Sequence, residues 1–403
     1  MKRSTRALIL LLAAAIVAIG ILTWGDLPFT GGANPSQPDK PPLTTEPSTL
    51  PPPPPPSEVI FMAVGDNLIH KPIYNQAKAR AKDGADYDFA PAYAGVRWLL
   101  ARADLSMINQ ETPIATAVAP VSSYPMFCSP PEVGDAIYSL GFRAIQVINN
   151  HTLDKREAGV LAHLDYWDSW GDVCHFGAYR DSAESMEPRT LTVNGITFGF
   201  VGATFSYNGL VLPQGSPLVL PRLEQEELLR LQIGIARDHA DVVVVSPHWG
   251  TEDSTRVNDQ QRELARKFID WGADMVIGNH PHVLQHMEFL DKLGGGQAFV
   301  AYSLGNFLSG QNAAPNLVGG VLELTITKDN TSGRVTIEQP RFHPVITQYE
   351  AGFSNIRLIP WSEYTPELGN RHGVRSKDSR FGYSYIERLL REIVPEGILV
   401  MDG

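Results

Sequence analysis

Short apolar runs that alternate with helix-patterned segments constrain the fold of this chain more than any other feature. The runs occupy residues 59–64, 105–108, 144–148, 242–245 and 274–277. Apolar residues recur at helical spacing between them, in residues 93–103, 131–140, 157–170, 223–239 and 260–271. Buried strands that alternate with helices predict an α/β fold with a largely parallel sheet that helices cover on both faces.

Further strands of antiparallel type are expected beside this sheet. Asn194-Gly195 is a favoured two-residue turn, so residues 190–193 and 197–201 should pair as a hairpin. Residues 321–327 and 334–338 alternate between apolar and polar in the same manner.

The two ends of the chain differ from the part that should fold. Basic residues precede an apolar segment at the start, so residues 1–24 are expected to be a signal-anchor transmembrane segment. A cleaved signal peptide is the alternative, and both interpretations place the folded domain outside the cytoplasm, at the cell membrane. Residues 25–57 are rich in proline and predict an extended linker. Residues 341–403 are polar and irregular apart from a helical pattern at 385–393, so we expect a peripheral extension after a domain of residues 58–340.

Charge and cysteine content limit the function classes. A formal net charge of −11 argues against a nucleic-acid partner, because binding to phosphates requires clustered Lys and Arg. Cys128 and Cys174 are the two cysteines. An exported protein can join them in a disulfide, and two buried free thiols are the alternative.

Residues of metal-ligand type follow the apolar runs. They are Asp66, Glu111, Asn150, His151, His248, His280 and His282. Each has a structural alternative when taken alone, such as a helix N-cap for Asp66. The carboxyl ends of parallel strands meet at one sheet edge, so we expect these side chains to gather there. Mixed oxygen and nitrogen ligands suit Mn, Zn or Fe, and the set is large enough for two divalent ions about 3.5 to 4 Å apart.

The motifs around these residues carry a family resemblance. They are Gly65-Asp66-Asn67-Leu68-Ile69-His70, Asn109-Gln110-Glu111-Thr112-Pro113, Asn149-Asn150-His151, His248-Trp249-Gly250, Gly278-Asn279-His280-Pro281-His282 and Tyr302-Ser303-Leu304-Gly305-Asn306-Phe307. In this order they resemble the CapA, or poly-γ-glutamate capsule biosynthesis, family of the calcineurin-like metallophosphoesterase superfamily. The resemblance implies a four-layer α/β/β/α metallophosphoesterase-like sandwich over residues 58–340, with a dimetal centre at the sheet edge.

The resemblance also implies a role for each site residue. Asp66 and His282 would hold one metal, and Glu111 would bridge to the other. Asn150, His248 and His280 would hold the second metal. His151 would stand beside the substrate as the catalytic residue, in a proton-transfer role that imidazole suits near neutral pH.

Two positions depart from the superfamily pattern and weaken the first metal. Leu68 stands where the first motif has His, and Glu111 stands where the bridging residue is usually Asp. His70 is expected to compensate as a ligand or else to orient other groups. Asn67 and Asn109 are expected to hydrogen-bond to the ligating carboxylates.

Two functions of different classes fit this sequence. The first is a metal-dependent hydrolase that cleaves a phosphoester or an amide in an anionic polymer or cell-wall substrate. The second is a non-catalytic accessory protein that binds metal and anionic polymer during synthesis or export. Either would be tethered to the membrane by the N-terminal helix, and a polymer synthase complex is the expected protein partner.

Overall fold

The computed structural model describes residues 54–82 and 84–401. The expected anchor, residues 1–24, and nearly all of the expected linker lie outside these ranges. Among the described residues, no helix combines the length and the apolar character needed to cross a membrane.

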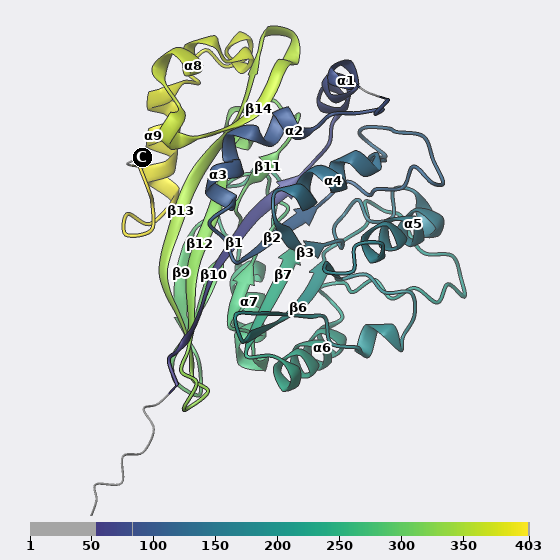
Figure 1. Ribbon diagram of the computed structural model, residues 1–403, viewed down its shortest axis with the longest axis vertical. Coiled ribbons are helices and arrows are strands. Elements are labelled where there is room, and N and C mark those ends of the chain that lie inside the picture. Colours follow the sequence, from purple (N-terminus) through teal and green to yellow (C-terminus); the bar gives the residue numbers. More distant parts are fainter. Residues whose placement is uncertain (1–53, 83, 402–403) are drawn as a thin grey trace, which may run out of the picture. The chain divides into compact units, whose positions relative to one another are not determined.

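The first of two sheets has eight strands. In spatial order they are β14 (Ser354–Pro360), β13 (Val335–Glu350), β12 (Val318–Lys328), β1 (Ser57–Asn67), β2 (Leu105–Gln110), β3 (Phe142–Gln146) and β4 (Cys174–Phe176), with β11 (Asn306–Leu308) beside the end of β1. The strands from β1 to β4 run parallel, and β12, β13 and β14 add antiparallel pairs (Figure 1).

The second sheet has six strands. Their order is β5 (Thr190–Val193), β6 (Ile196–Thr204), β7 (Val242–His248), β8 (Met275–Ile277), β10 (Gln297–Ala301) and β9 (Met287–Asp291). The four inner strands are parallel, and β5 and β9 form antiparallel edges. Asn194 and Gly195 join β5 to β6 with φ angles of 49° and 79°, the positive values that a tight hairpin turn requires.

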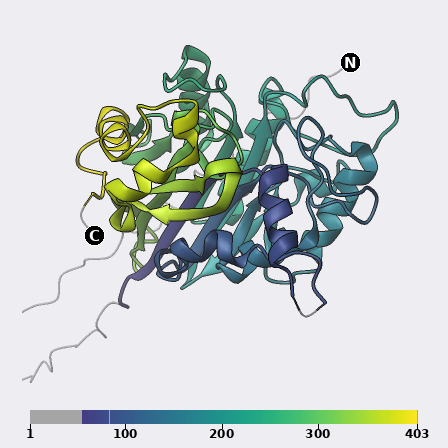
Figure 2. The ribbon, with the colours of Figure 1, turned by 90° about the horizontal axis from the view of Figure 1, so that it is seen from above.

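Helices surround the strands when the fold is viewed from above (Figure 2). They are α1 (Lys71–Arg80), α2 (Ala90–Tyr93), α3 (Arg97–Leu100), α4 (Pro131–Ser139), α5 (Arg156–Asp168), α6 (Glu226–His239), α7 (Asp259–Trp271), α8 (Pro366–Arg371) and α9 (Tyr383–Ile393). The single helix predicted for residues 93–103 is instead α2, a 3-10 turn and α3. A Cβ at Gly95 would overlap the backbone of Leu358, so this segment bends where β14 approaches it.

Alternating side chains of β7 show how the layers stack. Val242 and Val244 belong to the core between the two sheets, where Phe61 of β1 stacks on Phe198 of β6 with ring centroids 5.9 Å apart. Val243 and Val245 belong to a separate cluster with the apolar faces of α6 and α7. The second sheet is therefore buried on both faces, as a parallel strand composed mainly of valine predicts. A mixed α/β fold with two packed sheets is confirmed.

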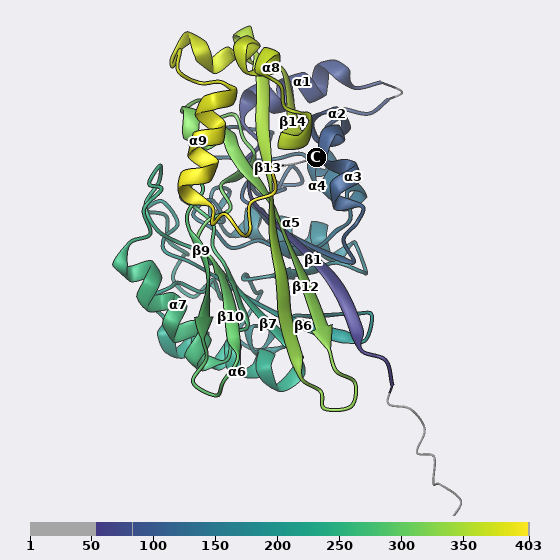
Figure 3. The ribbon, with the colours of Figure 1, turned by 90° about the vertical axis from the view of Figure 1, so that its left-hand side faces the viewer.

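The expected boundary at residue 340 falls inside β13, which pairs with β12 on both sides of it. Pro53–Gly403 form one compact unit, and α8 and α9 lie beside β13 (Figure 3). The boundary at residue 340 therefore divides a strand, and the residues after it complete the edge of the first sheet. Several polar residues after position 340 are paired in the interior, which their sequence pattern does not reveal. His343 Nε2 lies 3.0 Å from Glu323, and Tyr364 donates to Gln348 at 3.1 Å.

Cys128 and Cys174 are both free and buried. The alternative of two buried thiols therefore holds, and the disulfide does not form.

Candidate metal centre

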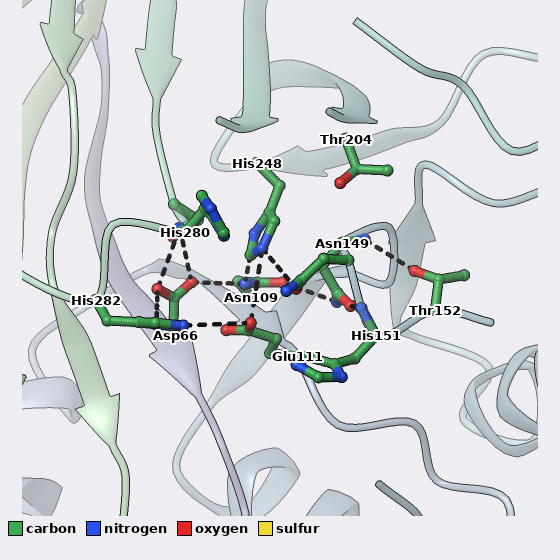
Figure 4. A network of polar contacts seen from close by, with 12 residues as sticks. Asp66, Asn109, Glu111, Asn149, His151, Thr152, Thr204, His248, His280 and His282 are labelled. Carbon is green, nitrogen blue, oxygen red and sulfur yellow. Dashed lines mark hydrogen bonds and ion pairs between the residues drawn. The ribbon is translucent and has the colours of Figure 1, made fainter. Parts of the chain in front are cut away.

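The ends of strands from both sheets bring the predicted side chains into one buried region (Figure 4). Asp66 and Asn109 are neighbours in register on β1 and β2, and His248 at the end of β7 bridges to Asn279 after β8. The buried residues gathered here are Asp66, Glu111, Asn150, His151, His248, His280 and His282. The topology therefore brings together the seven side chains of metal-ligand type that follow the strands.

Asp66 lies at the centre of the hydrogen bonds. Its carboxylate accepts from Asn109 Nδ2 at 2.7 Å and from the His280 backbone N–H at 3.2 Å, and it lies 3.0 Å from His282 Nδ1. Burial lowers the pKa of His282, but the hydrogen bond and charge of Asp66 outweigh it and raise that pKa above its usual value. The ligand atoms of Asp66, Glu111 and His282 lie within 4.8 Å of one another, close enough to hold one cation.

Glu111 has no hydrogen-bond partner among the described residues for either carboxylate oxygen, although the side chain is fully buried. Imidazole nitrogens of His248 and His282 are nearest, at 3.6 and 3.8 Å from Oε1. Burial and the charge of Asp66 raise the pKa of Glu111 well above its usual range. A buried carboxylate without donors is costly, and a divalent cation would supply the missing charge. The residues present therefore fit a metal.

His248 and His280 are held in the neutral form that ligates metals. Burial and the neighbouring His280 and His282 lower the pKa of His248 well below its usual value. Burial lowers the pKa of His280 to about 3. His248 Nε2 lies 3.0 Å from Asn150 Oδ1, whereas His280 Nδ1 is buried without a partner among the described residues.

His151 is oriented by a residue that sequence reasoning missed. Its Nδ1 lies 2.8 Å from Asp154 Oδ2, which also accepts from the Phe127 backbone N–H at 2.6 Å. The Phe127 ring packs edge-on against the imidazole, with centroids 4.7 Å apart. A signal was present in the sequence, because Asp154 follows His151 by three residues, a spacing at which a turn brings side chains together.

Asn109 has the role expected of it, whereas Asn67 and His70 make other contacts. Asn109 donates to Asp66, as described above. Asn67 instead donates to Gln110 at 2.8 Å and accepts from Tyr93 at 2.9 Å, so it braces β1 against β2 and does not orient a ligating carboxylate. His70 belongs to neither group of candidate metal ligands, and its Nδ1 accepts from the Gly310 backbone N–H at 3.2 Å.

Glu252 is the other residue that sequence reasoning missed. It lies in the loop after β7, and its carboxylate forms a second group of candidate ligands with His280 and His282, again within 4.8 Å. It follows His248 by four residues, so a carboxylate just beyond a strand tip was the available signal.

The turn from Gly278 to His282 aims both imidazoles by means of an unusual backbone. A Cβ at Gly278 would overlap the Tyr302 carbonyl oxygen and the Trp249 indole nitrogen, so only glycine fits. His280 and His282 have φ angles of 99° and 59°, which residues with a Cβ rarely adopt. Such strain is typical of functional sites, where surrounding contacts hold the backbone in place.

Two curated proteins and a solved structure are similar to this chain. The PGA biosynthesis protein CapA of Bacillus subtilis is 32% identical over 206 residues, which cover 51% of this chain and 52% of the relative. The capsule biosynthesis protein CapA of Bacillus anthracis is 30% identical over 185 residues, which cover 45% of this chain and 43% of that protein. The chain thus spans about half the length of these curated relatives. A solved phosphatase structure from Mycoplasma pneumoniae has a TM-score of 0.43 at 12% identity, covering 72% of this chain and 94% of that one.

A family description matches the part of the chain that holds the site. Residues 60–311 match the family described as bacterial capsule synthesis protein PGA_cap. The matched segment includes both sheets' parallel strands and every nominated site residue, and it is more than half of the chain. This protein therefore belongs to the bacterial capsule synthesis protein PGA_cap family.

Proposed function

We propose that this protein is a metal-dependent hydrolase of capsule or other cell-surface polymer biosynthesis, tethered to the membrane by residues 1–24 and acting outside the cytoplasm. Its substrate would be a phosphoester or an amide in an anionic polymer such as poly-γ-glutamate. The names of the two CapA relatives support the polymer, and the basic and apolar start of the chain supports the location.

The unpartnered carboxylate of Glu111 is the observation that carries this proposal. Asp66, His282 and His248 lie near Glu111, and together these residues would hold divalent ions of Mn, Zn or Fe type. Asn150 and His280 would complete this set. Ions bound there would act as Lewis acids and lower the pKa of a water molecule.

His151 is the proposed proton-transfer residue of the chain. Asp154 accepts a hydrogen bond from Nδ1, which fixes the tautomer and leaves Nε2 to exchange a proton with the substrate. The Phe127 ring restricts rotation of the imidazole. His151 thus donates to the leaving group, or stabilises the charge that develops there.

The test uses the full chain, purified in detergent, with bound metal measured by elemental analysis. Bis(p-nitrophenyl) phosphate and γ-glutamyl-p-nitroanilide serve as phosphodiester and amide probes. We expect turnover of one probe, and His151→Ala should lower kcat by about 10² to 10⁴ while metal content is kept.

The control is His175→Ala, because His175 is a buried imidazole that also pairs with an aspartate, Asp168, at 2.8 Å, but outside the site. His175→Ala should retain activity when it is assayed at a temperature at which the variant is still folded. Full metal content with no turnover of either probe would contradict the hydrolase and favour the accessory role.

A further inference from the structure

The loop after β7 is fixed on top of the turn that carries His280 and His282. The Asp253 backbone N–H donates to the Pro281 carbonyl oxygen at 2.9 Å. Gln285 Nε2 donates to the carbonyl oxygens of Ser254 and Arg256 at 2.9 and 3.0 Å. These contacts define where the side chains of this loop lie relative to the two imidazoles.

Within this loop the two adjacent acidic residues differ. Asp253 is engaged, because its Oδ1 accepts from Asn316 Nδ2 at 2.7 Å. Glu252 is exposed to solvent, and its carboxylate lies within 4.8 Å of ring nitrogens of His280 and His282. The Nδ1 atom of His280 is buried without a partner among the described residues. An open carboxylate thus faces an imidazole that has an unused ligand atom.

The first motif lacks one imidazole that the superfamily pattern has. Leu68 occupies the position where the superfamily pattern has an imidazole, and it is buried and apolar. His70 does not replace it, because it belongs to neither group of candidate metal ligands. Asp66, Glu111 and His282 would be the protein ligands on that side of the centre, and a side chain from another element would add to them.

We propose that Glu252 is a metal ligand, which joins His280 and His282 at the solvent side of the centre. This inference rests on the proposed metal centre. His282 then belongs to both ligand groups, so it links the buried group of Asp66 and Glu111 to the group that contains Glu252. Because Glu252 is exposed, the ion that it holds is the one that exchanges with solvent.

The test measures metal binding without substrate. The full chain is stripped with a chelator and titrated with Mn²⁺ in a calorimeter. Glu252→Gln should remove one binding event or weaken its Kd by about 100-fold, since even residues that only orient ligands contribute about 10- to 100-fold. Glu224→Gln removes an exposed carboxylate of another loop and should bind as wild type does.

A third variant separates this inference from the proposed centre. If Glu111→Gln loses Mn²⁺ binding and Glu252→Gln binds with the wild-type Kd and stoichiometry, Glu252 is not a ligand and the inference is overturned. If Glu111→Gln also binds as wild type does, the metal centre itself is wrong. Thermal melting of the stripped proteins verifies folding, which an exposed substitution at residue 252 should leave unchanged.

Discussion

At the scale of single residues, Glu111 lowers the stability of the metal-free protein. Its carboxylate is fully buried, lies near the like charge of Asp66 and has no donor among the described residues. A group whose pKa is raised on folding contributes stability that is complete below its unfolded pKa and is lost as pH rises. At neutral pH the metal-free protein therefore carries a penalty at this position.

Glu111→Gln should consequently stabilise the metal-free protein while removing its response to metal. We expect a gain of about 1 to 3 kcal/mol in the free energy of unfolding at pH 7, the usual cost of an unsatisfied buried polar group. Urea unfolding with chelator and with excess Mn²⁺ measures both effects.

Glu323→Gln is the matched control, because that buried carboxylate is paired with Arg102 at 2.8 Å and His343 at 3.0 Å. It should destabilise the metal-free protein. A Glu111→Gln protein that is no more stable without metal, yet is still stabilised by Mn²⁺, would refute this account.

At the scale of elements, the turn after β8 couples packing to the site. Gly278 allows the Trp249 indole N–H to donate to the Tyr302 carbonyl oxygen at 2.9 Å, and Trp249 stacks on Tyr302 and Phe268 beneath it. The same turn then delivers His280 and His282. Packing below the turn therefore fixes the direction of both imidazoles above it.

Gly278→Ala should damage stability and metal binding together. The added methyl group would overlap the Tyr302 carbonyl oxygen, and overpacking of this kind costs about 1 to 3 kcal/mol. Gly234→Ala is the control, because nothing lies within 4 Å of a Cβ there in α6, and it should stabilise by about 0.5 to 1 kcal/mol. Thermal melting and Mn²⁺ titration of both variants test this. Normal Mn²⁺ affinity in a destabilised Gly278→Ala protein would separate packing from the site.

The sequence predicts those elements whose own pattern decides their structure. The valine-rich strand β7, the Asn194-Gly195 hairpin and α7 all appear near their predicted positions. Helix α1 was not predicted, because only Ile73 and Ala77 of it are buried and its periodicity is faint. Long-range contacts decided the other differences, such as the approach of β14 at Gly95.

In the candidate site too, local patterns predicted some residues, and long-range contacts determine the others. Residues at strand tips could be predicted because a parallel sheet brings its tips to one edge. Asp154 and Glu252 lie in irregular segments whose positions depend on long-range contacts. Asp154 accepts from the Phe127 backbone N–H, and Asp253, next to Glu252, donates to the Pro281 carbonyl oxygen. The sequence therefore indicated residues in or just after strand tips, whereas Asp154 and Glu252, which lie further along their loops, were missed.

At the scale of the whole molecule, buried neutral histidines outside the site make stability depend on pH. Burial lowers the pKa of His163 to about 3 and that of His372 to about 4. Unfolded histidine takes up a proton near its ordinary pKa of 6.5, whereas these folded residues do not. Their contribution is therefore complete above pH 6.5 and is lost as pH falls toward 4 and then 3.

The metal-free protein should thus lose stability between pH 6.5 and pH 4. Each such histidine removes up to about 1.4 kcal/mol for each pH unit. Urea unfolding at pH 7.5, 6 and 5 measures the slope, and His163→Gln should reduce it by one histidine's share. A free energy of unfolding that stays constant from pH 7.5 to pH 5 would contradict this expectation.

Strand β1 runs from the first described residues to the site. It begins at Ser57, directly after the proline-rich segment, and reaches the centre at Asp66, with β12 and β2 paired along its two edges. A pull on the chain ahead of Ser57 acts along β1, and the ladder to β12 opposes it with hydrogen bonds perpendicular to the force. These bonds must shear together and cannot open one at a time. Tension applied at Ser57 would thus be resisted along the strand before it reached Asp66.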